Sequence, residues 1–159
     1  MAATSLEQIK VLQDRIEREA EAYSRLIAVL TQEQQVLVAA RPEGLQDIVA
    51  EKNRLLDQLT ALSRDRQHAM NALGLPRDPD RAEKSLGRHP LAAAYRKLRD
   101  LARQSSMLNA LNGRLANQKL QFVSARLDVL RGAAQRAGLY DMHGRAGDVS
   151  STSRIIAAA

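Results

Sequence analysis

The sequence contains no cysteine, no tryptophan and only 3% aromatic residues. The absence of cysteine excludes disulfides and thiolate metal sites, and it fits a reducing compartment. The scarcity of aromatic residues argues against β-sandwiches, barrels and stacking platforms for single-stranded nucleic acid. What is present is a 159-residue chain, 45% hydrophobic and rich in the helix formers leucine, alanine, arginine, glutamine and glutamate. We therefore expect an all-α fold with a single core.

Long hydrophobic runs are also missing. No stretch approaches the run of about 18 apolar residues that suggests a membrane-spanning helix, so no stable membrane insertion is expected. Residues 1–10 have no basic start followed by an apolar core, so we expect no secretory signal. The expected location is cytoplasmic.

Apolar residues at intervals of three and four predict two long helices. Residues 4–40 begin with a capping-box sequence at Thr4, and residues 43–73 repeat the apolar pattern. Lys52 and Arg66 interrupt the second apolar line, where we expect their stems to pack and their charged heads to reach solvent. Gly74 stands where a C′ glycine would end the helix. Because a short linker joins the two helices, we expect an antiparallel hairpin.

A third helix is predicted over residues 90–137, because Leu101, Leu108, Leu115 and Phe122 follow a seven-residue repeat. Residues 74–89 are expected to form a connector with one short helical turn over residues 79–86. At about 1.5 Å per residue the third helix is longer than the hairpin, so part of it should have no hairpin beneath it. Residues 4–137 would form an elongated, coiled-coil-like bundle, followed by a flexible, mostly disordered tail over residues 138–159.

The C-terminal half of the third helix carries a second apolar line. Leu120, Val123, Leu127 and Leu130 step by three and four, centred about 120° around the helix from the first line. A helix with two separated apolar lines has two surfaces to cover. Either a fourth element, such as the tail or a second subunit, covers the second line, or the line is a groove for a partner's amphipathic helix.

Charge is unevenly distributed along the chain. Residues 1–75 hold nine basic and eleven acidic residues, net −2, whereas residues 76–137 hold thirteen and five, net +8. The basic third helix can be neutralised by the hairpin or can attract an acidic partner. A basic helical nucleic-acid binder is one alternative, weakened because the positive residues are spread around the helix. A self-associating coiled coil that covers its own second line is another.

The side chains needed for catalysis or metal binding do not converge. His68, His89 and His143 lie on separate predicted elements, without the spacing of a metal site. The serines near the C-terminus have no neighbouring base held in place. We therefore expect no enzymatic activity, no metal and no cofactor.

Short motifs follow one another in order along the chain. The first two helices contain Glu19, Tyr23, Leu26-Ile27 and Leu30, then Lys52-x-x-Leu55-Leu56-x-x-Leu59 and Leu73-Gly74. The third helix and the tail contain Leu108-Asn109-Ala110-Leu111-Asn112-Gly113-Arg114-Leu115, Leu139-Tyr140-Asp141-Met142-His143-Gly144 and Arg154-Ile155-Ile156. Together these motifs resemble the FlgN-type flagellar export chaperones over residues 5–156. One departure is Tyr95, in a region where relatives often carry tryptophan.

The resemblance implies a non-enzymatic cytoplasmic chaperone for the hook-associated proteins, which join hook to filament. Such chaperones bind the C-terminal amphipathic helices of their clients and contact the export gate of the flagellar type III apparatus; nucleic acid is not expected among their partners. Combined with the second apolar line, it gives a client groove that comprises Leu120, Val123, Leu127, Leu130, Asn109, Asn112 and Gly113. The export-gate contact carries over to Tyr140. A structural alternative stays open for Asn109, Asn112 and Gly113, because asparagine in a helix seam fixes register and glycine permits close helix approach.

Overall fold

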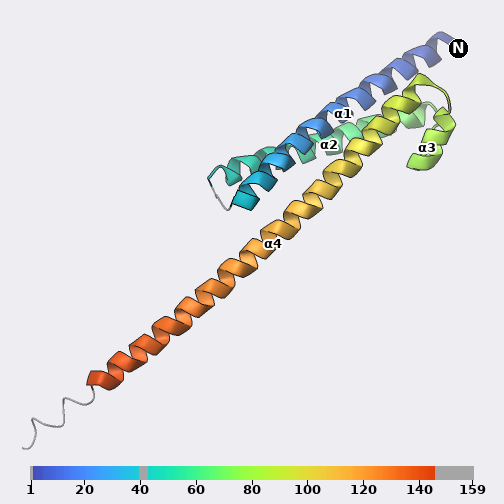
Figure 1. The fold of residues 1–159 in the computed structure, drawn as a ribbon. Coiled ribbons are helices and arrows are strands. Elements are labelled where there is room, and N and C mark those ends of the chain that lie inside the picture. The colour runs from blue at the N-terminus through green and yellow to red at the C-terminus, as the bar shows by residue number, and fades with distance from the viewer. Residues whose placement is uncertain (1, 40–42, 146–159) are drawn as a thin grey trace, which may run out of the picture. The chain divides into compact units, whose positions relative to one another are not determined.

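The structure, a computed structural model, describes residues 2–39 and 43–145, with side chains described at 6–39 and 43–135. That part of the chain forms four helices and no strand: α1 (Ala2–Ala39), α2 (Leu45–Ala72), α3 (Pro79–Leu86) and α4 (Pro90–Arg145) (Figure 1). The predicted all-α fold, a helical hairpin plus a long third helix, is confirmed. None of the described helices is long and apolar enough to cross a bilayer.

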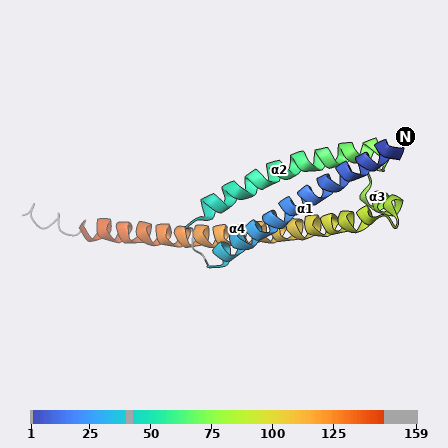
Figure 2. The ribbon, with the colours of Figure 1, turned by 90° about the horizontal axis from the view of Figure 1, so that it is seen from above.

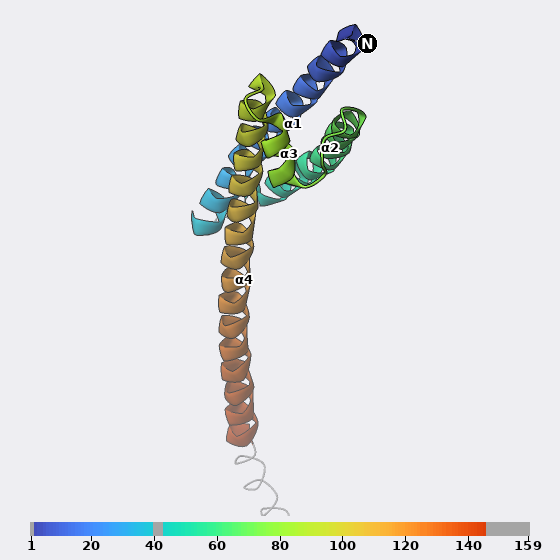
Figure 3. The same ribbon diagram turned by 90° about the vertical axis from the view of Figure 1, so that its right-hand side faces the viewer.

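The chain divides into two compact units, Met1–Ala116 and Asn117–Ala159. The first unit contains α1, α2, α3 and the first half of α4. In it, α1 and α2 pack together as an antiparallel hairpin (Figures 1 and 2). The short helix α3 lies beside the start of α4 (Figures 1 and 3). The second half of α4 belongs to the second unit.

The core of the first unit consists of two apolar clusters. One joins all four helices and contains Leu12, Ile16, Met70, Ala82, Leu91, Tyr95 and Leu98. The other lies farther along the hairpin, with Leu108 of α4 packed against it, and contains Ala22, Leu26, Leu30, Leu55 and Leu59. Full burial of each large aliphatic side chain contributes about 1.5–3 kcal/mol, so these clusters hold the first half of α4 on the hairpin.

Two buried ion pairs cross between α1 and α2 in the same seam. Arg66 Nε donates to Glu19 Oε2 at 2.6 Å, and Lys52 Nζ donates to Glu33 Oε1 at 2.5 Å. The side chains of Arg66 and Lys52 are 14% and 17% exposed. The expectation that their charged heads reach solvent is therefore wrong, because a carboxylate of α1 lies opposite each of them.

Gly74 ends α2 as predicted. Its φ of +68° lies in the left-handed region that glycine adopts without strain. The Gly74 N–H donates to the Asn71 carbonyl and the Leu75 N–H to the Met70 carbonyl, both at 3.0 Å. These two bonds form a Schellman motif, which satisfies carbonyls that the helix end leaves without partners.

The expected short helical turn at residues 79–86 is α3, which is tied to the start of α4. Asp78 caps it, because its Oδ1 accepts a hydrogen bond from the Arg81 N–H at 2.8 Å. Glu83 then accepts from Arg96 at 2.8 Å and from Arg99 at 2.6 Å. The hydrogen bond from Arg96, with that from Arg99, lowers the pKa of Glu83. Two of the basic residues of the 76–137 segment are thus neutralised by α3.

Helix α4 continues to Arg145, eight residues beyond the predicted end at Ala137. Gly138 and Gly144 are the weak helix formers in that extension. Each costs about 1 kcal/mol relative to alanine in a helix interior, far less than a proline would. Residues 146–159 of the predicted flexible tail, including Arg154-Ile155-Ile156, lie outside the described residues.

Candidate functional site

The second apolar line of α4 lies in the unit that begins at Asn117, and its side chains are exposed. The exposed fractions are 69% for Leu120, 53% for Val123, 46% for Leu127 and 64% for Leu130. We call these four residues the α4 strip. Single exposed leucines are common, but contiguous exposed apolar surface is typical of interaction sites, so the α4 strip is a candidate site.

The first apolar line of α4 is the seven-residue repeat that runs through Leu101, Leu108, Leu115, Phe122 and Val129. Its members in the same unit, Phe122 and Val129, are exposed as well. Leu108 packs against the hairpin core, whereas Phe122 and Val129 are 60% and 72% exposed. The Arg126 guanidinium lies 4.8 Å from the centroid of the Phe122 ring, a cation–π contact. Together with Ala125 and Leu130, these side chains line a shallow apolar hollow of about 530 Å³. Two adjacent apolar surfaces therefore flank Arg126.

Asn112, predicted to lie in the client groove, is buried inside the first unit. Its Nδ2 donates to the Leu30 carbonyl and to Glu33 Oε2, both at 2.8 Å. Because Glu33 also pairs with Lys52, one polar network joins α1, α2 and α4. Among the described residues, Asn112 Oδ1 has no hydrogen-bond partner. These contacts are those of an asparagine that fixes the register of packed helices.

Asn109 and Gly113, the other two residues of the predicted groove outside the α4 strip, are exposed. No described atom lies within 4 Å of the position that a Cβ on Gly113 would occupy. The suggestion that Gly113 permits a close helix approach is therefore wrong for the described residues. Asn109 instead lines a groove in the first unit.

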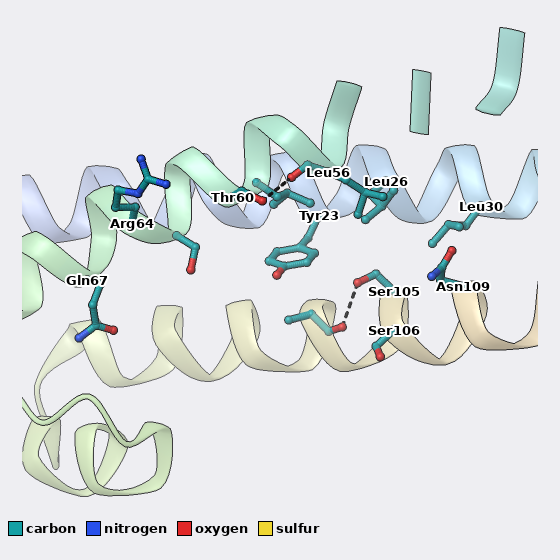
Figure 4. A pocket seen from close by; sticks show the side chains of 13 residues that line it. Tyr23, Leu26, Leu30, Leu56, Thr60, Arg64, Gln67, Ser105, Ser106 and Asn109 are labelled. Carbon is teal, nitrogen blue, oxygen red and sulfur yellow. Dashed lines mark hydrogen bonds between the residues drawn. The ribbon is translucent and has the colours of Figure 1, made fainter. Parts of the chain in front are cut away.

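This groove, which sequence reasoning missed, lies between α1, α2 and α4 (Figure 4). It measures about 620 Å³, and it is lined by Tyr23, Leu26, Leu30, Leu56, Leu59, Thr60, Ser63, Arg64, Gln67, Ala102, Ser105, Ser106 and Asn109. The ring of Tyr23 projects into it from α1. Burial, followed by the Glu19 charge, raises the pKa of Tyr23.

The hydroxyl groups of the groove are partly committed to their own helices. Ser105 Oγ donates to the Ala102 carbonyl and Thr60 Oγ1 to the Leu56 carbonyl, both at 2.9 Å (Figure 4). The lining therefore combines apolar side chains with polar groups, and two of the hydroxyl groups are already hydrogen-bonded within their own helices. The signal in the sequence is the pair Ser105-Ser106, which stands where the apolar pattern of α4 predicts packing.

Residues 1–147 match the family model described as FlgN protein. The chain belongs to the FlgN family. Members of this family are flagellar export chaperones. No curated protein and no solved structure matches the chain. The FlgN match spans α1 to α4, so the resemblance inferred from the short motifs is confirmed.

For a member of a chaperone family, the relevant features are surfaces that can bind another chain. The α4 strip is an exposed apolar surface at helical spacing. Tyr140, for which the resemblance implies an export-gate contact, lies near the end of α4, and its side chain is outside the described residues.

Proposed function

We propose that this FlgN-family chain binds the C-terminal amphipathic helices of the hook-filament junction proteins in the cytoplasm and delivers them to the flagellar type III export apparatus. The observation that carries the proposal is the exposed α4 strip. In an amphipathic client helix, apolar residues recur at the same intervals of three and four. The client helix would therefore lie along α4 and cover the strip.

The expected affinity suits a chaperone that must release its client. Burying the remaining exposed surface of the four strip residues contributes on the order of 3–7 kcal/mol. The client's own apolar face is buried at the same time and contributes a similar amount. Association costs about 4–15 kcal/mol in lost freedom. Only the upper end of the gain set against the lower end of the cost reaches about −8 to −10 kcal/mol, so micromolar binding lies at the favourable end of these ranges, where it is tight enough for capture and still reversible.

The predicted site residues outside the α4 strip take different roles in this proposal. Asn109 and Gly113 are exposed on α4 and border the client site. Asn112 acts from inside, since its hydrogen bonds to α1 fix the register of α4 on the hairpin. Tyr140 acts after client capture, at the export gate.

The proposal is tested by co-purification of the full chain with the C-terminal helical segments of hook-associated proteins. Leu127→Asp should abolish co-purification, because it places a charge in the middle of an apolar contact. Helicity by circular dichroism should be preserved, because Leu127 is exposed in the chain alone. Leu6→Asp is the matched control: Leu6 is 59% exposed on α1, and this variant should retain the client.

Tyr140→Ala separates capture from delivery. The variant should bind the client as the native chain does and should reduce secretion of the hook-associated proteins. Normal client retention by Leu127→Asp would show that the α4 strip is not the client site. Loss of client binding in Tyr140→Ala would show that Tyr140 belongs to the capture surface instead.

A further inference from the structure

Two cations stand between the two apolar lines of α4. At about 100° per residue, Lys119 and Arg126 project from the gap that separates the α4 strip from the line of Phe122 and Val129. Asp128, the single carboxylate among residues 117–135, projects about 180° away from Lys119. A helix that covers both lines must therefore also cover Lys119 and Arg126, and among residues 117–135 α4 supplies no carboxylate on that side.

Neither cation has an ion-pair partner among the described side chains. Among the described residues, the Arg126 guanidinium contacts the Phe122 ring. Covering an unpaired charge with an apolar surface removes its hydration water, and no ion pair or hydrogen bond then compensates for the cost of desolvation. An occupant of this face therefore needs anionic groups opposite these two positions.

A comparable need is met in the hairpin. Lys52 and Arg66 stand within the apolar line of α2, whereas Lys119 and Arg126 stand between the two apolar lines of α4, but in both helices the cations lie on a face that another helix would cover. Each α2 cation is paired with a carboxylate of the facing helix. The hairpin thus shows what a helix must carry to cover a basic, apolar face in this protein.

We propose that the helix that docks on the α4 strip carries two carboxylates about one heptad apart within its own apolar face, placed to pair with Lys119 and Arg126. This inference rests on the proposed function, because it specifies the chemistry of the client helix. Charge complementarity also disfavours a second copy of this chain as the occupant. Two α4 faces packed together in parallel place like cations opposite each other, and in antiparallel packing Lys119 meets Arg126.

The probe is a set of three synthetic amphipathic peptides with the same leucine face. They differ at two positions, seven residues apart within that face, which carry glutamate, glutamine or lysine. Calorimetric titration of the full chain should show the glutamate peptide binding about tenfold or more tighter than the glutamine peptide, and the lysine peptide binding most weakly. The difference between the glutamate and glutamine peptides should shrink at high salt.

The matched variants are Lys119→Glu/Arg126→Glu and Lys97→Glu/Arg103→Glu. Lys97 and Arg103 are exposed residues of α4 in the first unit and form no ion pair with the described side chains. The second variant therefore changes the net charge equally and leaves the docking face intact. Lys119→Glu/Arg126→Glu should reverse the preference, so that the lysine peptide binds tightest, whereas Lys97→Glu/Arg103→Glu should keep the native order.

The outcomes separate this inference from the proposed function. Equal binding of all three peptides by the native chain, with loss of all binding in Leu127→Asp, would overturn the inference and leave the strip as the client site. Unchanged binding in Leu127→Asp would instead overturn the placement of the client on α4. Failure of the native chain to bind the glutamate peptide, or a stable homodimer in sedimentation that Leu127→Asp dissociates, would overturn the inference as well.

Discussion

Replacing only one residue of the Glu19–Arg66 ion pair should destabilise the hairpin much more than replacing both residues with apolar ones. Glu19 is 2% exposed and Arg66 14% exposed, and 2.6 Å separates Oε2 from Nε. Glu19→Gln leaves the Arg66 guanidinium buried without its counter-charge. Such a loss costs about 3–5 kcal/mol, a large part of the roughly 5–15 kcal/mol that stabilises a typical domain.

The double variant Glu19→Leu/Arg66→Met should recover that loss. Replacing a buried ion pair with apolar residues of similar volume is neutral or stabilising by about 1–4 kcal/mol, because both desolvation costs disappear. Equilibrium unfolding in urea, followed by circular dichroism, measures each free energy of unfolding. Urea is preferable to guanidinium chloride because it does not screen the charges.

The pair Arg15–Asp65 is a control in the same two helices. Its atoms are also 2.6 Å apart, but its side chains are 35% and 49% exposed. Because solvent screens this pair, Asp65→Asn should cost about 1 kcal/mol or less. The reasoning would be refuted if Glu19→Gln cost no more than Asp65→Asn, or if the double variant were as unstable as Glu19→Gln.

Three further predictions concern individual residues. Asn112→Ala should lower the free energy of unfolding in urea by about 1–3 kcal/mol, since it removes two hydrogen bonds to α1, whereas exposed Asn109→Ala should change it by less than about 0.5 kcal/mol. Gly74→Ala should lower stability by about 1 kcal/mol or more in thermal unfolding, because alanine is strained at a φ of +68°. Burial raises the pKa of Tyr23 and Tyr95, so the unfolded chain loses these protons first. The contribution of these tyrosines to the free energy of unfolding should therefore be fully present below the ordinary tyrosine pKa of about 10. It should be lost as the pH rises through the higher pKa values of the folded chain. Ultraviolet titration that shows every tyrosine ionising at its ordinary pKa in the folded chain would contradict this.

The sequence predicts the helices and their ends because those depend on local signals. Apolar spacing locates the helices, and Gly74 supplies the left-handed conformation that ends α2. The extension of α4 past Ala137 was not predicted, because glycine weakens a helix without stopping it.

The partners of Lys52 and Arg66 could not be read from the apolar pattern, because they depend on the register of two helices. Glu19 and Glu33 are spaced like Lys52 and Arg66, in the opposite order, so one antiparallel register satisfies both pairs. A hairpin slipped by seven residues would place Arg66 opposite Leu12 and Lys52 opposite Leu26. The matched spacing was therefore the available signal for the register.

The exposure of the α4 strip was predictable, because one helix carries more apolar surface than a single hairpin covers. The sequence left two interpretations of Asn112 open, a client contact and a buried residue that fixes register. Deciding between them required knowing that Glu33 of α1 lies opposite Asn112. The Tyr23 groove is lined by three helices, so its shape depends on their packing, and the pair Ser105-Ser106 was the only local signal for it.

The most direct test of client binding on α4 is hydrogen–deuterium exchange of the full chain, alone and saturated with a C-terminal client helix. If the client docks on the strip, amide exchange should slow across residues 117–135 on binding, because the docked helix suppresses opening of α4. Protection confined to residues 1–116, around the Tyr23 groove, with no change at 117–135, would contradict the account.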